Sequence, residues 1–327
     1  MDADFAKMLD RLREQIDHGL AEYAPDQKPR SLYEPMRYAL AGGGKRLRPL
    51  LLLLACETVG GEAEQGLAAA LALELVHNFT LVHDDIMDHD DLRRGRETVY
   101  KKWEQNTAIL AGDGLLVQAF SALARVEPAL LPRALTAFTD GILEVCEGQA
   151  MDKEFESRSL VALDEYYTMI AKKTGRLFSL ACEIGAVLGH GDADQIHRLS
   201  EYGALLGRAF QIQDDVLDIA AEEEMLGKDI GSDIRENKKS FLMVHLFQVA
   251  PSDLQQTMHR LSQQSELSPA DIRLAKEVFL AAGSLQAAET EIARCLKKAE
   301  AVLHPLPQGD AKNRLVFLLT ALSRRKF

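Results

Sequence analysis

Proline placement is the strongest constraint on what this chain of 327 residues can fold into. Its ten prolines leave two long stretches without any, between Pro49 and Pro128 and between Pro132 and Pro251. Proline interrupts helices, and these stretches are rich in Ala, Leu, Glu, Gln and Arg, which are strong helix formers. The sequence therefore predicts an all-α protein.

The apolar pattern indicates how these helices are arranged. Segments 64–82 and 196–219 carry apolar residues nearly all round, which is typical of helices buried inside a large bundle. The glycine and proline breaks between predicted helices are short, and none is a low-complexity linker. We therefore expect residues 1–327 to form a single domain, a large helical bundle with its active site inside.

Composition excludes several functional classes. The chain is 47% hydrophobic and 27% charged, as expected of a soluble globular protein, and its net charge of −12 argues against nucleic-acid binding. The longest aliphatic run, residues 50–55, is far short of the roughly 20 residues of a membrane span. The four cysteines are far apart and form no CxxC pair, so we expect no zinc site, no disulfide framework and a cytoplasmic location.

A repeated acidic motif points to function. Residues 84–88 read DDIMD and residues 214–218 read DDVLD, each at the end of an apolar helical segment. One such motif is commonly a solvated helix face, but two copies in the same context are harder to explain in that way. Helix geometry directs positions i and i+4 to one face, so Asp84 points with Asp88, and Asp214 with Asp218.

The middle carboxylates have a different expected role. Asp85 and Asp215 are turned about 100° from their neighbours on the helix, so they are better suited to supporting the others than to binding a ligand directly. Clustered carboxylates repel one another unless a cation lies between them. Because oxygen ligands without cysteine favour Mg²⁺, which commonly bridges carboxylates to phosphates, the motifs predict a magnesium-bound diphosphate.

Basic residues near the motifs support a diphosphate ligand. A flexible glycine run, residues 42–44, directly precedes Lys45, Arg46 and Arg48, although such a loop can also be merely solvated. Arginine binds phosphate through a planar fork and lysine as a point charge. Cations also follow each motif or lie between them; these are Arg93, Arg94, Lys173, Lys228, Lys238 and Lys239.

Taken together, these segments resemble the trans-isoprenyl diphosphate synthases, the polyprenyl synthetase family, and most closely its geranylgeranyl diphosphate synthase branch. The matching segments occur in the family's order and span about two thirds of the chain; they are GGGKRLRP (42–49), ELVHNFTLVHDDIMDHDDLRRG (74–95), AILAGDGLL (108–116), EGQAMD (147–152), KKTGRLF (172–178), GRAFQIQDDVLD (207–218) and GKDIGSDIRENKKS (227–240). The resemblance implies an all-helical homodimer in which both motifs face a central catalytic cleft.

The resemblance also implies a role for each matching residue. The direct ligands of three Mg²⁺ ions would be Asp84, Asp88 and Asp214. The carboxylates that support them or hold metal-bound waters would be Asp85, Asp215 and Asp218. The residues that hold the allylic diphosphate would be Arg93, Lys173, Lys228 and Lys238, and those that hold isopentenyl diphosphate would be Lys45, Arg48, His77 and Arg94. Thr174 and Gln211 would lie beside the reacting carbons, and Gln149 with Asp152 near the metal waters.

The resemblance further implies the reaction and its product. An allylic diphosphate (dimethylallyl, geranyl or farnesyl) would ionise, and isopentenyl diphosphate would add to it head to tail. In the family, bulky residues just before the first motif close the product tunnel; here Phe79 and Thr80 stand five and four residues before Asp84. This pattern predicts geranylgeranyl diphosphate, with farnesyl or longer products as the alternative and ordinary core packing as the other interpretation of Phe79.

Two departures and several competing functions stay open. Residues 97–98 read Glu-Thr where the family often has Pro-Thr, and the Asn237–Ser240 variant of the last cationic motif leaves open whether Lys238 or Lys239 contacts phosphate. A terpene cyclase would normally lack the second DDxxD. An all-α metal phosphohydrolase would leave Asp214 and the glycine loop unexplained, and a non-catalytic regulatory subunit would usually have a degraded motif.

Overall fold

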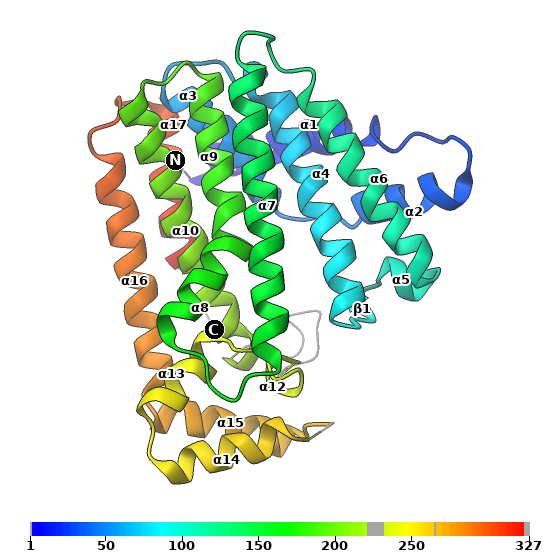
Figure 1. Cartoon of the computed structure of the whole chain (residues 1–327). Helices are drawn as coiled ribbons and strands as arrows, with labels where there is room; N and C mark the ends of the chain where they lie inside the picture. Colours follow the sequence, from blue (N-terminus) through cyan, green and yellow to red (C-terminus); the bar gives the residue numbers. More distant parts are fainter. Residues whose placement is uncertain (1, 221–231, 265, 324–327) are drawn as a thin grey trace. The chain divides into compact units, whose positions relative to one another are not determined.

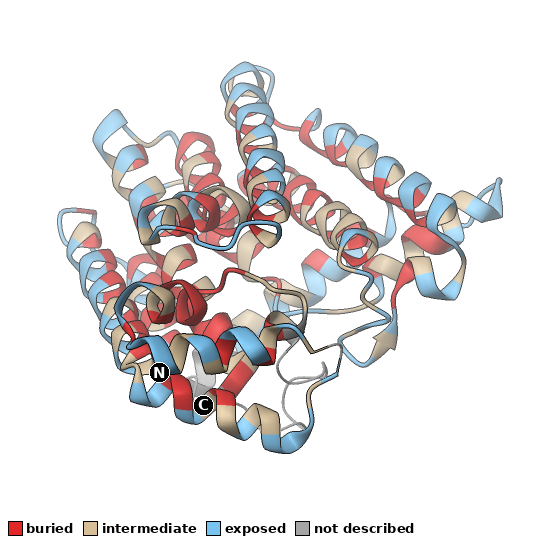
Figure 2. Ribbon diagram, turned by 60° about the horizontal axis from the view of Figure 1, so that its bottom comes forward, coloured by how far each residue is buried: buried red, intermediate tan, exposed pale blue. Residues whose placement is uncertain are grey.

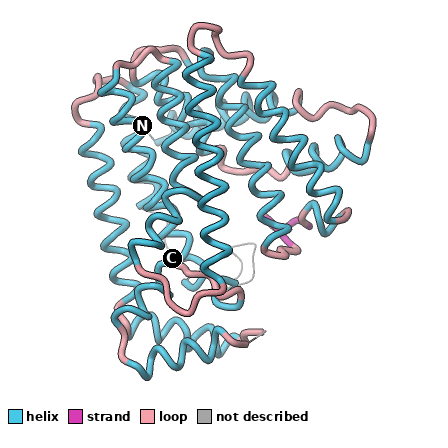
Figure 3. Tube along the Cα trace, in the orientation of Figure 1, coloured by secondary structure: helices cyan, strands magenta, loops and turns pink. Residues whose placement is uncertain are grey.

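The computed structural model describes residues 2–220, 232–264 and 266–323. Figure 3 shows helices joined by short loops, with one pair of short strands in this described part of the chain. Strands β1 (Leu92–Arg93) and β2 (Arg96–Glu97) pair antiparallel, with Leu92 opposite Glu97. The prediction of an all-α fold is confirmed.

The helices are labelled in Figure 1. Those of the first half of the chain are α1 (Asp2–Ala21), α2 (Arg30–Leu40), α3 (Leu47–Thr58), α4 (Ala63–Met87), α5 (Val99–Lys102), α6 (Gln105–Leu123), α7 (Leu131–Glu156) and α8 (Leu163–Ile170). Those of the second half are the π-helical turn η1 (Ala171–Gly175), α9 (Arg176–Leu188), α10 (Ala193–Ala220), α12 (Ser232–Arg235), α13 (Phe241–Val249), α14 (Ser252–Ser262), α15 (Pro269–Ala281), α16 (Ser284–Leu303) and α17 (Asp310–Ser323). The proline-free stretches contain α4 and α10, with 25 and 28 residues.

Helix ends follow from local hydrogen bonds. At the start of α15, the Asp271 amide donates to Ser268 Oγ at 3.2 Å and the Ser268 amide donates back to Asp271 Oδ2 at 3.0 Å, with Pro269 in the first helical turn. At the start of α4, the Glu62 amide donates to Gln65 Oε1 at 2.7 Å. Such bonds satisfy backbone groups that a helix end leaves without a partner.

The chain divides into two compact units. The first unit comprises Met1–Ile142, Leu177–Gly203 and Val302–Leu318, and the second comprises Leu143–Arg176, Ala204–Ala301 and Leu319–Phe327. Helices α7 and α10 each pass from one unit into the other, so neither unit is a continuous stretch of sequence. The expectation of a single domain over residues 1–327 stays a prediction.

Helix α4 is the core helix of the first unit and packs against α3 and α6. Residues Leu71–Val76 are buried without a break, as the apolar pattern of segment 64–82 predicts, and Figure 2 shows most other helices with both buried and exposed residues. Among the described helices, α4 alone is long and apolar enough to cross a membrane, and 61% of its most apolar window is already buried within the protein. This is the pattern of a core helix.

The second unit is built around aromatic residues and an irregular turn. Tyr166 on α8 and Phe241 on α13 are almost fully buried, with their ring centroids 6.0 Å apart. Helix α8 continues directly into η1, which carries Lys173 and Thr174. Single π-helical turns inside α-helices occur frequently at functional sites. Lys173 and Thr174 therefore lie on a locally widened turn of the helix.

The cysteines play no covalent structural role. All four are free thiols, and Cys56, Cys182 and Cys295 are buried, which raises the pKa of each thiol.

Candidate active site

The first acidic motif lies at the end of α4 and has one buried and two accessible members. The side chain of Asp85 is 5% exposed, whereas that of Asp84 is 23% exposed and Asp88 is half-buried. Burial raises the pKa of Asp85 to about 6, although the ion pair with Arg93 opposes this. Asp84 and Asp88 are thus the more accessible members of the motif.

A β-hairpin places the two arginines that follow the motif. Arg93 forms an ion pair through Nε with Asp85, and its Nη2 lies 3.8 Å from Asp84 Oδ2. The turn between β1 and β2 has positive φ angles at Arg94 and Gly95, 55° and 72°, and it directs Arg94 toward the glycine loop, where Nη1 donates to the Gly43 carbonyl. The hairpin thus separates the two side chains, one toward the carboxylates and one toward the loop.

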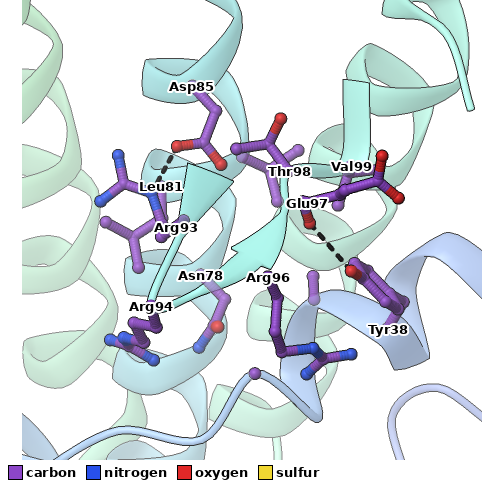
Figure 4. A pocket seen from close by; sticks show the side chains of 13 residues that line it. Tyr38, Asn78, Leu81, Asp85, Arg93, Arg94, Arg96, Glu97, Thr98 and Val99 are labelled. Atoms are coloured by element: carbon purple, nitrogen blue, oxygen red, sulfur yellow. Dashed lines mark hydrogen bonds and ion pairs between the residues drawn. The ribbon is translucent and has the colours of Figure 1, made fainter. Parts of the chain in front are cut away.

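Figure 4 shows the pocket that the hairpin residues help to line. Tyr38 donates to the Glu97 carbonyl at 2.9 Å, and the Arg96 guanidinium stacks over the Tyr38 ring at 4.2 Å. The hydroxyl of Thr98 is buried and has no hydrogen-bond partner in the described structure. The Glu-Thr departure from the family pattern therefore leaves the hairpin intact, since Glu97 contributes only its backbone to this contact.

The glycine loop is fixed by Arg46, whose role the sequence did not reveal. Arg46 is almost fully buried with a φ of 48°, and its guanidinium bonds Glu74 Oε1 at 2.6 Å and Asp17 Oδ1 at 2.8 Å. A buried guanidinium is stable only with such charged partners. Arg46 therefore anchors the loop and leaves Lys45, which is exposed, as its accessible cation.

His77 and Arg48 lie together in the first unit. Arg48 Nη1 is 3.1 Å from His77 Nε2, and its guanidinium lies 4.7 Å from the Phe178 ring centroid. Burial lowers the pKa of His77 well below its usual value, and the nearby Arg48 and Arg94 lower it further. A neutral His77 accepts a hydrogen bond from Arg48 and adds no charge to this cationic region.

The residues proposed to set product length lie on α4 one turn before the motif. The Phe79 ring packs edge to face on His83, with centroids 4.7 Å apart, and Thr80 Oγ1 donates to the His77 carbonyl at 2.8 Å. Both side chains are half-buried. Phe79 is therefore held by a neighbouring ring and is not fully enclosed in the core.

The second acidic motif lies near the end of α10 and repeats the pattern of the first. Asp214 and Asp218 are half-buried, whereas Asp215 is buried and accepts hydrogen bonds from Tyr166, Gln211 and the Phe241 amide. Burial raises the pKa of Asp215 to about 7, and these three donors oppose the rise. Thr174 in turn donates to Gln211 Oε1 at 2.6 Å.

A cluster of carboxylates on α7 holds two of the predicted lysines. Asp152 Oδ2 lies 2.6 Å from Lys173 Nζ and 3.4 Å from Lys238 Nζ, and Glu156 Oε1 lies 2.8 Å from Lys238 Nζ. Gln149 stands on the same helix and is half-buried. The sequence did not single out Glu156, although its spacing of four residues from Asp152 places it on the same helix face.

The same region distinguishes Lys238 from Lys239. Lys239 is 7% exposed, its Nζ donates to the Asn237 carbonyl at 3.0 Å, and burial lowers its pKa. Lys238, by contrast, extends toward Lys173 and Asp152. Lys238 therefore lies with the other predicted site residues, Lys173 and Asp152. The other cation expected near it, Lys228, lies outside the described residues.

Each unit therefore gathers its own share of the predicted site. The first unit holds Lys45, Arg48, His77, Phe79, Thr80, Asp84, Asp85, Asp88, Arg93 and Arg94. The second holds Gln149, Asp152, Lys173, Thr174, Gln211, Asp214, Asp215, Asp218 and Lys238. Within the described ranges no group of three or more His, Cys, Asp or Glu side chains forms a ready metal cage. The accessible carboxylate oxygens do fit Mg²⁺, which binds through one or two carboxylates together with substrate phosphates.

Known proteins resemble this chain along most of its length. The polyprenyl synthetase family model matches residues 29–279. A geranylgeranyl diphosphate synthase of Methanosarcina mazei is 46% identical over 235 residues, covering 71% of this chain and 72% of that protein. A short chain isoprenyl diphosphate synthase of Methanothermobacter thermautotrophicus is 36% identical over 98% of both chains. The crystal structure of geranylgeranyl pyrophosphate synthetase from Pyrococcus horikoshii superimposes with a TM-score of 0.93 at 40% identity, covering 98% of both chains.

The helical fold and the paired acidic motifs with their cations define a trans-prenyltransferase. The chain belongs to the polyprenyl synthetase family, which confirms the resemblance found in its motifs, and it is an isoprenyl diphosphate synthase. This family membership excludes the phosphohydrolase and terpene cyclase interpretations.

Proposed function

We propose that this chain condenses isopentenyl diphosphate with an allylic diphosphate and releases geranylgeranyl diphosphate. The observation that carries the proposal is that each DDxxD motif combines accessible carboxylates with cations of its own unit. Arg93 accompanies Asp84 and Asp85 in the first unit, and Lys173 and Lys238 occupy the second unit with Asp214. Such a combination suits a diphosphate that is bound together with Mg²⁺.

The binding roles follow from accessibility and charge. Asp84, Asp88 and Asp214 would hold three Mg²⁺ ions, with Asp85, Asp215 and Asp218 supporting them. Bound there, Mg²⁺ would neutralise the leaving diphosphate and lower the barrier to breaking the allylic C–O bond. Arg93, Lys173, Lys228 and Lys238 bind the allylic diphosphate in this proposal. Lys45, Arg48, His77 and Arg94 bind isopentenyl diphosphate, since they lie on or beside the glycine loop or bond one another.

The reacting carbons would lie beside Thr174 and Gln211. The Thr174 hydroxyl donates a hydrogen bond to Gln211 Oε1, so the lone pairs of the Thr174 oxygen stay available to a cationic carbon. Gln149 and Asp152 would contact water near the diphosphate. We also propose that residues 1–327 form one domain with its active site inside. Exclusion of water from that site would protect the allylic cation from capture.

The functional experiment uses the purified chain alone. It is incubated with isopentenyl diphosphate, Mg²⁺ and, in separate reactions, dimethylallyl, geranyl or farnesyl diphosphate, and the dephosphorylated alcohols are sized by chromatography. We expect the twenty-carbon alcohol from all three starters, and none after Mg²⁺ is removed with a chelator. If farnesol or an alcohol longer than twenty carbons were the end product, the chain would be a farnesyl or longer-chain synthase. If no product formed, a non-catalytic regulatory subunit would be favoured.

Phe79→Ala is expected to lengthen the product. The Phe79 side chain stands five residues before Asp84, is half-buried and packs on the His83 ring, so its removal would deepen the proposed tunnel. Chromatography of the alcohols should show a shift from twenty carbons to twenty-five or more. Phe247→Ala, on a half-buried ring of α13, serves as the control. An unchanged product distribution would mean that Phe79 is ordinary packing.

We also propose a cytoplasmic homodimer, with α6 as the contact between copies. Four apolar side chains of α6 are exposed, namely Ile109, Leu110, Val117 and Phe120, and Leu110 and Val117 are 58% and 64% exposed. Their spacing of seven residues places them on one face, which a second copy of the chain could cover. Light scattering should give twice the chain mass, and Leu110→Glu with Val117→Glu should shift it to the monomer.

A further inference from the structure

Asp215 is fixed by three hydrogen-bond donors from separate segments. Its Oδ2 accepts from Tyr166 Oη at 2.7 Å and from the Phe241 amide at 2.7 Å, and its Oδ1 accepts from Gln211 Nε2 at 2.8 Å. Both oxygens are thus bonded inside the protein, and the residue is only 5% exposed. Asp215 is therefore placed to orient its neighbours and not to contact substrate.

Gln211 transmits this orientation to η1. Its amide nitrogen donates to Asp215, and its amide oxygen accepts from Thr174 Oγ1 at 2.6 Å. If the amide were flipped, its oxygen would face the Asp215 carboxylate and that bond would be lost, while its nitrogen would donate to the Thr174 hydroxyl and reverse the other bond. The carboxylate therefore selects one orientation of Gln211, and Gln211 fixes the direction in which Thr174 donates.

Tyr166 is the only side-chain donor to Asp215 Oδ2 in the described structure. Its ring is buried beside Phe241 and Tyr167, with centroids 6.0 and 5.8 Å away, so the hydroxyl is held in a fixed position. The hydroxyl stands at the start of a continuous series of hydrogen bonds that runs through Asp215 and Gln211 to Thr174.

We infer that Tyr166 is a positioning residue for prenyl transfer, whose hydroxyl fixes the Thr174–Gln211 pair through Asp215. The inference rests on the proposed function, in which that pair lies beside the reacting carbons. Tyr166 itself does not reach the substrate, since it is 1% exposed. Its effect is expected on the chemical step and not on the binding of either diphosphate.

The test removes the hydroxyl and keeps the ring. Tyr166→Phe should lower kcat by about 10- to 100-fold, the usual cost of losing a group that orients a ligand-binding side chain, with the KM of both diphosphates within twofold of the parent. Tyr202→Phe is the matched control, because Tyr202 is also fully buried and its hydroxyl makes one described bond, to the Leu315 carbonyl at 2.8 Å. It should lose a similar amount of thermal stability and keep its kcat.

A double-mutant cycle separates positioning from a general structural effect. If Tyr166 acts through Thr174, Tyr166→Phe should lower kcat no further in a Thr174→Val background, because the two effects are not additive. An unchanged kcat for Tyr166→Phe, or an equal loss in both backgrounds, overturns the inference. Lack of activity in the parent protein would instead reject the proposed function, so the two failures are distinguishable.

Discussion

Asp84→Asn and Asp214→Asn are each expected to lower kcat by about three orders of magnitude. Each substitution removes an accessible carboxylate from a different DDxxD motif, and metal-assisted stabilisation of a leaving group is worth several kcal/mol, about 1.4 kcal/mol for each factor of ten. The measurement is steady-state prenyl transfer at saturating Mg²⁺ with both diphosphates. The melting temperature should stay close to that of the parent, because both side chains are partly exposed.

The double variant shows whether the two motifs serve one diphosphate. If the two motifs act as a unit, the double variant Asp84→Asn with Asp214→Asn should be only slightly less active than the less active of the two single variants. Other residues that act jointly in catalysis behave in this way. Asp140→Asn, on an exposed position of α7, provides the control and should keep full activity. Losses that simply multiply would indicate two independent sites, and single variants within tenfold of the parent would remove the basis of the proposed function.

Gly148→Ala is expected to have the next largest effect, on both stability and turnover. Gly148 lies on α7 where η1 passes closely, and a Cβ atom at this position would collide with the Lys173 backbone nitrogen and lie 2.7 Å from Lys173 Cα. To relieve the collision, either α7 or η1 must shift, and η1 carries Lys173 and Thr174. Overpacking of this kind costs about 3 kcal/mol. We expect a lower midpoint of denaturant unfolding and a kcat reduced by at least tenfold.

Gly309→Ala is the control for this substitution. An added Cβ at Gly309 meets no atom within 4 Å, so the variant should unfold at the same denaturant concentration as the parent. If Gly148→Ala were equally harmless, the close packing of α7 against η1 would not be required, and Lys173 would not depend on it.

Periodicity and spacing predicted most of what depends on single helices. The proline-free stretches contain the long helices α4 and α10. The helical offset of Asp85 and Asp215 from their neighbours agrees with the burial of both side chains. These features are local, since the i+4 rule determines which side chains share a face whatever the rest of the fold does. The order of the motifs was also sufficient to identify the family.

Features that depend on packing between distant segments could not be predicted from the sequence. The π-helical turn η1 has no distinctive residue pattern, and Arg46 looks like another loop cation until Glu74 and Asp17 are seen to enclose it. Lys238 and Lys239 are adjacent and chemically identical, so only their partners in the folded chain distinguish them. The partners that determine the positions of Arg46 and Lys238 lie many residues away in the sequence.

The carboxylates of α7 have a consequence for which anions this protein can retain. Asp152 and Glu156 already balance the charges of Lys173 and Lys238 before any substrate arrives. An incoming anion must therefore compete with two carboxylates for the same ammonium groups, and a singly charged ion gains little from the exchange. A pyrophosphate ester accompanied by divalent cations brings several charges of both signs, so it can replace these ion pairs as a set. We therefore expect small phosphate species to compete poorly for Lys173 and Lys238.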